Sequence, residues 1–232
     1  MCIRDRSSTI KPGAHIHTVT FKVTVWIWAP GLIVDDCMSI DNIVDLTGID
    51  VSYENDKAHL HIDITNYDHP ITKNLPKGTC FGPEISRWHT VLFKESGFIE
   101  DDPTFTIGPI FYSKDPDALT LGKLSLNGEA GFVIKEFEDW TSIYVSVPMI
   151  SKNVLRNIAK YARVHIYVES GELVYGNKHF LCIYPRVGGK KTVNLPEPKT
   201  VIDLWSDILV AKNRCIFDVN MESNKAYMYL LK

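Results

Sequence analysis

Residues 23–28 form an almost unbroken run of β-prone side chains, Val-Thr-Val-Trp-Ile-Trp, and this run constrains the fold more than any other segment. A strand with one face in water alternates apolar and polar residues, whereas a continuous run is typical of a strand covered on both faces, as in a parallel sheet. Ala29-Pro30-Gly31 then ends the strand in a turn. The run therefore predicts an interior strand of a parallel sheet.

An interior strand needs neighbours, and the sequence before this one offers few. Residues 1–22 contain at most one weak strand, at residues 15–21. Residues 1–7, Met-Cys-Ile-Arg-Asp-Arg-Ser, resemble a translated sequencing adapter, and we interpret residues 1–19 as artefactual or disordered. We therefore expect a truncated domain whose earlier strands and helices belong upstream.

Two helices are predicted from their capping residues. Ser39 and Gly48 bracket a helix over residues 39–47, and Ser151 begins a second helix. The second helix carries an apolar stripe at helical spacing, formed by Val154, Leu155, Ile158, Ala159 and Ala162. Strands are predicted at residues 23–28, 59–64, 119–126, 131–137, 141–147 and 164–168.

The pattern of the sequence changes after residue 168. Short β-prone runs alternate with turns rich in glycine, proline and aspartate, and no helix pattern appears before Lys232. The fold class predicted is α/β followed by all-β. An α/β domain with a parallel sheet occupies residues 20–168, and a small antiparallel β-sandwich occupies residues 169–232.

Composition and charge exclude several classes of function. Hydrophobic residues make up 45% and charged residues 23% of the 232 residues, which is an ordinary globular balance. A net charge of −3 with scattered lysines and arginines indicates no nucleic-acid partner. No apolar run approaches the roughly 20 residues that span a membrane. The five cysteines are far apart and form no C-x-x-C pair, which favours free thiols and a cytoplasmic rather than a secreted protein.

Histidines supply the one pattern that suggests a metal site. His59, His61 and Asp63 have H-x-H-x-D spacing, which places all three on one face of a strand, and His15 and His17 form a second H-x-H pair. The pattern is short and further ligands are not evident. We interpret it as a solvated strand face and predict no metal and no cofactor.

Catalytic groups are not evident either. Cys37 precedes a helix, but Asp35 and Asp36 beside it would raise the pKa of the thiol, and the chain contains no G-x-S-x-G or G-x-C-x-G turn. Acids cluster at residues 100–102 and 136–139, yet spacing alone does not establish the facing pair that glycoside hydrolysis needs. No catalytic residue is assigned.

Three tryptophans, Trp88, Trp140 and Trp205, are candidate contacts for a sugar or for an interface. Indole rings stack on sugar rings, but a tryptophan more often packs in a core or an interface. Exposed, coplanar rings would favour a sugar-binding module, and buried rings would favour a scaffold.

Several stretches resemble one family in combination. Residues 25–31, followed by Ser39, Asn42, Leu46, Thr47 and Gly48, resemble the trimerisation domain of bacterial β-galactosidases, which is a glutamine-amidotransferase-like α/β domain. Residues 121–122, 140–142, 155–156 and 164–167 resemble the end of that domain. Residues 174–177, 189–192 and 195–196 resemble the small β domain that closes such proteins. Arg163 departs from the pattern, which has glycine at that position.

The resemblance covers residues 20–232 and carries expectations about fold and function. It implies part of a flavodoxin- or amidotransferase-like parallel sheet that lacks the Cys-His-Glu machinery. It also implies a homo-oligomer formed through the α/β domain and an upstream catalytic barrel whose active site this domain helps to wall. On this interpretation the chain is a non-catalytic oligomerisation and support module of a β-galactosidase-like glycoside hydrolase in carbohydrate metabolism. Two alternatives stay open: a carbohydrate-binding module, and an amidase or hydrolase of amidotransferase fold.

Overall fold

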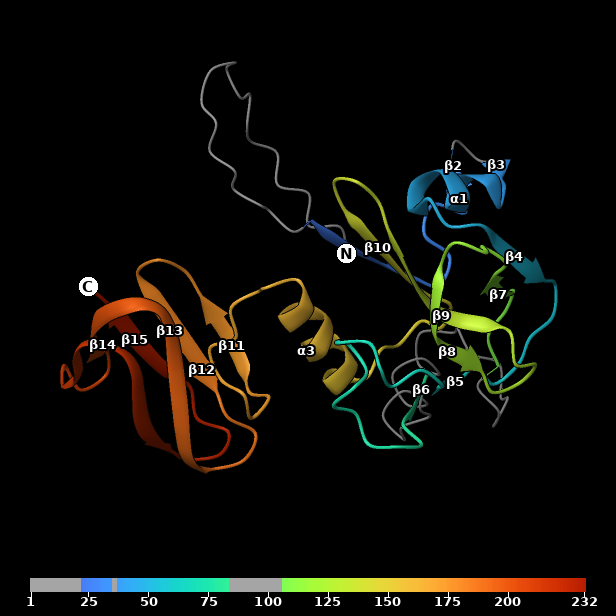
Figure 1. Cartoon of the computed structure of the whole chain (residues 1–232). Coiled ribbons are helices and arrows are strands. Elements are labelled where there is room, and N and C mark those ends of the chain that lie inside the picture. The colour runs from blue at the N-terminus through green and yellow to red at the C-terminus, as the bar shows by residue number, and fades with distance from the viewer. Residues whose placement is uncertain (1–21, 35–36, 84–105) are drawn as a thin grey trace, which may run out of the picture. The chain divides into compact units, whose positions relative to one another are not determined.

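The computed structural model describes residues 22–34, 37–83 and 106–232 (Figure 1). The chain divides into two compact units, Met1–Ala162 and Arg163–Lys232. Within the described residues the protein is mostly β, with two helices, and each unit has its own sheet. No helix in these residues is long and apolar enough to cross a bilayer. A mixed sheet with helices precedes an all-β part, in the order that the sequence predicts.

The first unit is built on a mixed sheet whose strands run in the order β1-β10-β9-β8-β5-β6, with β7 joined to β9 and β4 joined to β7. The strands are β1 (Val23–Ile27), β4 (Val51–Glu54), β5 (Ile62–Ile64), β6 (Cys80–Phe81), β7 (Ile110–Ser113), β8 (Leu119–Leu124), β9 (Ala130–Glu136) and β10 (Thr141–Val145). A separate hairpin is formed by β2 (Ile33–Val34) and β3 (Cys37–Met38).

The expectation of a parallel sheet holds at one pair among the described strands. β1 runs parallel to β10, while the other described pairs are antiparallel. The reason lies in the connections, because β8, β9 and β10 follow one another through short turns, and a short turn can join only antiparallel neighbours.

Strand β1 packs against core residues on both faces but is only half-buried, where its sequence predicts a fully covered strand. Val23 and Val25 pack against one core cluster, and Trp26 and Trp28 pack against a second cluster on the opposite face. The strand is not interior, however. Within the described residues it pairs only with β10 and therefore lies at the edge of the sheet.

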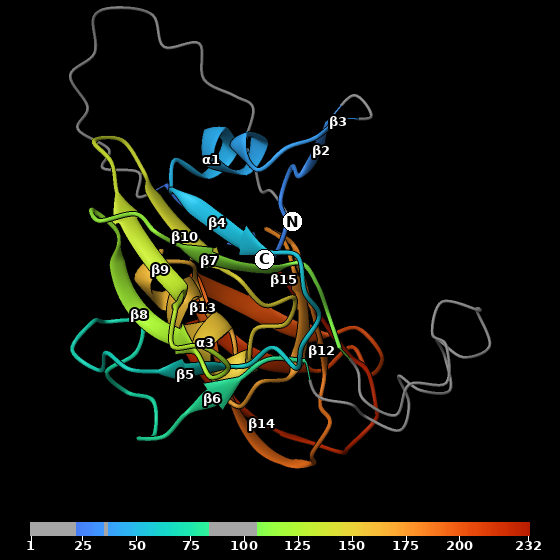
Figure 2. The ribbon, with the colours of Figure 1, turned by 90° about the vertical axis from the view of Figure 1, so that its right-hand side faces the viewer.

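The two helices pack against opposite faces of this sheet (Figures 1 and 2). Helix α1 (Asp41–Thr47) places Ile43 in the cluster that contains Trp26. Helix α3 (Lys152–Tyr161) places Val154 and Ile158 in the other cluster. The first unit therefore has three layers, with the sheet in the middle.

The predicted N-cap Ser151 and the predicted C-cap Gly48 are confirmed, whereas the first helix begins at Asp41 with Ile40 as its N-cap, so Ser39 lies one residue before the N-cap. The Ser39 hydroxyl accepts a hydrogen bond from the Asp41 N–H at 3.1 Å. The Ser151 hydroxyl accepts one from the Val154 N–H at 3.4 Å. Gly48 ends α1 with a φ of +68°, a left-handed conformation that glycine adopts without strain.

The second unit is a five-stranded antiparallel sheet in the order β11-β12-β15-β13-β14. Its strands are β11 (Leu173–Gly176), β12 (Phe180–Tyr184), β13 (Gly189–Asp203), β14 (Leu209–Met221) and β15 (Tyr227–Leu231). The all-β prediction is confirmed, but all five strands belong to one sheet, where the sequence predicted a two-sheet sandwich. Strand β13 is long enough to pair with β14 along most of its length and with β15 near its end, which joins the whole unit through hydrogen bonds.

One predicted strand is absent from this unit. Residues 164–168 form no strand, although the Tyr167 carbonyl accepts a hydrogen bond from the Asn194 N–H at 2.8 Å. The core of the unit includes Leu181, Ile183, Val193 and Tyr229 on the inner face of the sheet. Tyr167 packs against this core, so the segment is tied down by its side chain instead of by a ladder of hydrogen bonds.

Candidate functional site

The three candidate tryptophans do not form one site. Trp88 lies outside the described residues. Trp140, in the first unit, is half-buried and stacks on Phe137, with ring centroids 4.7 Å apart and planes 8° from parallel. Trp205, in the second unit, is 69% exposed in the turn that follows β13. One face of the Trp140 ring is thus already covered by a neighbour in its hairpin, whereas the Trp205 ring is open to solvent.

The histidine pattern is not arranged as a metal centre. Only Asp63 of the three residues lies within β5, and both His59 and Asp63 are exposed. Within the described ranges, no group of three or more His, Cys, Asp or Glu side chains is placed to hold a metal ion. His15 and His17 lie outside those ranges.

Among the thiols that the structure describes, Cys80 lacks the setting of a nucleophile. Cys37 lies in β3, whose side-chain environment is not among the described features. Partial burial and a hydrogen bond with the Asp63 side chain raise the pKa of the Cys80 thiol above its usual value. A raised pKa leaves less thiolate at neutral pH, so Cys80 is not activated.

The most deeply buried carboxylates serve as ion-pair partners. Asp115 is 4% exposed and accepts a hydrogen bond from Lys135 Nζ at 2.7 Å. Glu172 is also 4% exposed and is paired with Lys191. Burial by itself would raise both pKa values, but the lysines and nearby N–H groups hold them below the usual range. A general acid needs a raised pKa, so neither carboxyl is prepared for that role.

The acidic clusters at residues 100–102 and 136–139 form no facing pair of carboxylates among the described residues. Residues 100–102 lie outside the described ranges, and Glu138 and Asp139 are exposed in the β9–β10 turn. Glu136 accepts a hydrogen bond from the Tyr161 hydroxyl at 3.0 Å, which fixes the end of α3 against the sheet. Its role is therefore to position a helix.

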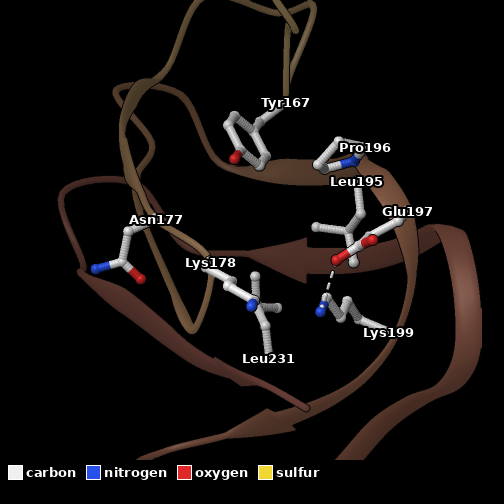
Figure 3. Close-up of a pocket in the computed structure, with 8 residues that line it drawn as sticks. All are labelled: Tyr167, Asn177, Lys178, Leu195, Pro196, Glu197, Lys199 and Leu231. Carbon is white, nitrogen blue, oxygen red and sulfur yellow. Dashed lines mark ion pairs between the residues drawn. The ribbon is translucent and has the colours of Figure 1, made fainter. Parts of the chain in front are cut away.

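Within the described residues, the second unit contains a pocket that is a candidate for binding a small molecule (Figure 3). Its volume is about 320 Å³, enough for one or two sugar-sized rings. The pocket combines an aromatic wall, an apolar floor and charged groups at the rim. The lining residues are Tyr167, Asn177, Lys178, Leu195, Pro196, Glu197, Lys199 and Leu231.

Backbone geometry places the aromatic wall. A Cβ on Gly176 would lie 3.2 Å from Tyr167 Cζ, so the ring lies closely over the glycine, and a larger residue there would push it away. The His165 ring meets the Tyr167 ring edge-on, with centroids 4.7 Å apart. Leu195 and Leu231 are buried beneath and supply the apolar floor.

The charged rim has one ion pair and one further cation. Lys199 Nζ donates to Glu197 Oε1 at 2.7 Å, and this hydrogen bond lowers the pKa of Glu197, with a smaller contribution from Lys178. Asn177 uses its side-chain oxygen to accept hydrogen bonds from the N–H groups of His179 and Phe180, which fixes the turn after β11. The Asn177 side-chain NH₂ group is not used in that turn and can donate to a ligand.

Sequence reasoning missed this pocket because the stretches 164–167, 174–177 and 195–196 were matched to a family separately, and nothing in the sequence indicated that they meet around one cavity. Tyr167 comes from a loop, Lys178 from a turn, and Glu197 and Lys199 from the middle of β13, where the register with β14 shifts.

The comparisons with known proteins show similarity of fold. No family model matches the chain, and no curated protein matches its sequence. The crystal structure of β-galactosidase from Bacillus circulans sp. alkalophilus matches 92% of this chain with a TM-score of 0.56 and 10% identity. The cold-adapted β-galactosidase from Rahnella sp. R3 matches 90% with a TM-score of 0.50 and 9% identity. The chain spans 30% and 28% of those two proteins, so its fold is that of a part of each.

Proposed function

We propose that this chain is a non-catalytic support module of a β-galactosidase-like glycoside hydrolase. The observation that carries the proposal is the fold match, which extends over 92% of this chain but only 30% of the B. circulans sp. alkalophilus enzyme. A match to 92% of the chain extends into both units, which differ in architecture. Such a combination is harder to reach by chance than a match to either unit alone.

The chemistry of the described residues is in accord with a non-catalytic role. Buried carboxylates are engaged with lysines and have lowered pKa values, and the Cys80 thiol has a raised one. In the finer form of the proposal, the first unit belongs to the amidotransferase-like class and brings copies of the parent enzyme together in the cytoplasm. The catalytic acids would then lie on a barrel outside this chain.

Hydrolysis of a nitrophenyl galactoside tests the proposal. The purified chain should release no nitrophenol above a heat-inactivated control. Turnover that disappears in a Glu136→Gln or Glu172→Gln variant, with the fold intact by circular dichroism, would overturn it. Reading the source locus upstream of Ser8 gives a second test, because the same frame should encode a barrel domain. An upstream frame that encodes no such domain would count equally against the proposal.

The pocket around Tyr167 favours a second function, the binding of a carbohydrate. It offers an aromatic ring, an amide and paired charges around an apolar floor, which are the groups that recognise sugar rings and hydroxyls. Trp205 offers a separate, exposed ring. Titration calorimetry with galactose and lactose should detect binding that Lys178→Ala weakens and Trp205→Ala leaves unchanged. The reverse pattern would assign binding to Trp205, and no heat with either sugar would contradict this second function.

A further inference from the structure

The outward face of the second unit's sheet is apolar over most of its width, and nothing in the pocket or the proposed function uses it. Side chains of a strand alternate between its two faces, and those that pair directly across strands share a face. Leu181 and Tyr229 pair with each other and belong to the buried core, so their neighbours in sequence point outward.

Register carries this outward face across all five strands. Tyr175 pairs with Cys182, and Cys182 pairs with Met228. Leu230 and Ile202 then pair with each other, and Ile202 pairs with Leu209. We call this surface the outer apolar face; its residues are Leu173, Tyr175, Phe180, Cys182, Tyr184, Ile202, Leu209, Met228 and Leu230. In Figure 1 the strands that carry it lie side by side.

The same sheet contains an internal comparison. Where β13 and β14 extend as a two-stranded arm, the outward pairs are Lys190 with Asn220, Thr192 with Asp218 and Asn194 with Ile216, so Ile216 is the one apolar residue among these six. Lys190 also forms an ion pair with Asp218, with Nζ and Oδ2 2.9 Å apart. That arm has the polar outer surface expected of a sheet that faces water. None of the nine named residues of the outer apolar face is charged, although the next outward pair along β13, Thr200 with Lys232, brings one lysine to its border.

The exposed area is large enough for a specific interface. Four members of the face are exposed, with exposed fractions of 52% for Leu173, 73% for Tyr175, 43% for Phe180 and 54% for Leu209. The other five members are half-buried. With typical side-chain areas, the face exposes roughly 600–700 Å². The largest apolar patch on an ordinary monomer is about 300–600 Å². Specific interfaces bury about 1,200–2,000 Å² in total, or about 600–1,000 Å² from each partner, so the face reaches the lower end of that range.

We propose that the outer apolar face binds the same face of a second copy of this chain. A face without charges needs no oppositely charged partner, and its own copy presents an equally apolar surface of matching area. A two-fold axis brings the same patch of both copies together, so each residue of the face is used twice. The broad sheet surface suits another sheet better than a small molecule, which requires a concave site. This contact is distinct from the oligomer contact proposed for the first unit and does not depend on it.

Sedimentation velocity tests the proposal between about 1 and 100 µM, where an interface of this area and modest affinity is measurable. The wild-type chain should dimerise. Tyr175→Lys should raise the dimer dissociation constant at least tenfold, and Leu209→Lys, on a different strand, should do the same. Ile216→Lys is the matched control, because Ile216 is 59% exposed but lies on the polar arm, and it should leave the dissociation constant unchanged.

Two results would overturn the proposal. A wild-type chain that stays monomeric at the highest concentration would assign the face to a different protein. A dimer that both lysine variants leave intact would place the contact elsewhere, for instance on the first unit. Circular dichroism and thermal unfolding identify a variant that has lost its fold. In that case Tyr175→Ser, which removes the exposed ring without adding a charge, takes its place with the same expected weakening of the dimer.

Discussion

The buried ion pair between Lys191 and Glu172 is expected to hold the second unit together, and replacing the lysine measures how much. The side chains are 8% and 4% exposed, and the pair joins β13 to the residue before β11. A second oxygen of Glu172 accepts a hydrogen bond from the Arg186 N–H at 2.9 Å, which ties in the turn between β12 and β13. Three segments therefore depend on one carboxylate.

Lys191→Met keeps most of the volume of the lysine stem and removes only the charge. The carboxylate of Glu172 then stays buried without its cation, a change that typically costs about 3–5 kcal/mol. Protonation of Glu172 and its remaining bond to Arg186 limit the loss, so we expect about 3 kcal/mol, or roughly a 150-fold change in the opening equilibrium. Adding Glu172→Gln to Lys191→Met removes the unpaired charge. The double variant should therefore be only about 1 kcal/mol less stable than the wild-type chain.

Hydrogen exchange followed by mass spectrometry measures the two units separately in the intact chain. Peptides from β12 to β15 should exchange roughly 150-fold faster in Lys191→Met, the factor that corresponds to about 3 kcal/mol. Peptides from β9 and β10 belong to the first unit and serve as the internal control. An acceleration below about fivefold, or an equal acceleration in β9 and β10, would refute the reasoning, because the pair would then contribute less than about 1 kcal/mol or act on the whole chain.

Three further predictions follow from the same kinds of contact. Glu172 has a lowered pKa in the folded chain, so its contribution to stability is complete above its ordinary pKa of 4.5 and is lost as the pH falls below that value. Hydrogen exchange in β12 to β15 should therefore accelerate in acid, and its dependence on pH should be weaker in Glu172→Gln. Gly48→Ala should lower the stability of the first unit by about 2–4 kcal/mol, measured by hydrogen exchange, because the new Cβ would lie 2.5 Å from Phe137 Cζ. Gly78 also has a positive φ, +77°, but has open space around it, so Gly78→Ala should lower stability by only about 1 kcal/mol. Equal losses for the two variants would contradict the role of the Phe137 contact. Tyr144→Phe should lower the free energy of unfolding in urea by about 1–2 kcal/mol, because the buried hydroxyl donates to a main-chain carbonyl at 2.6 Å. Ser146→Ala should lower it by less than about 0.5 kcal/mol, because the buried Ser146 hydroxyl has no partner among the described residues.

Local signals in the sequence predicted local structure well. Gly48 and Ser151 mark helix ends by hydrogen bonds within a few residues, so the capping pattern was sufficient there, while Ser39 lies one residue before the N-cap Ile40 and bonds only to Asp41. The run at residues 23–28 predicted a strand with core contacts on both faces, which depends on the side chains it carries, although the strand is half-buried and lies at the sheet edge. These features need no information about distant parts of the chain.

Pairing partners and the pocket depend on distant parts and could not be predicted. The β1–β10 contact is parallel, but the direction of the neighbouring strands is set by turn lengths in another region. The second unit was expected to form two sheets because short strands and turns look alike in a sandwich and in a single sheet. The pocket needs the Tyr167 loop to lie beside Glu197, and no spacing rule relates those residues.

Pairing of β1 with β10 has a consequence for how the chain is made. Val23 pairs with Thr141, so the partner of an early strand is synthesised more than a hundred residues later. At roughly 5–20 residues per second, the ribosome needs on the order of ten seconds to cover that distance. Throughout that time the nascent chain presents Val-Thr-Val-Trp-Ile-Trp, an uncharged, β-prone segment without proline, of the kind that joins strands of other chains. Nascent chains stalled before Thr141 should therefore bind chaperones or aggregate, and chains that have exposed Val145 outside the ribosome should be released from both fates.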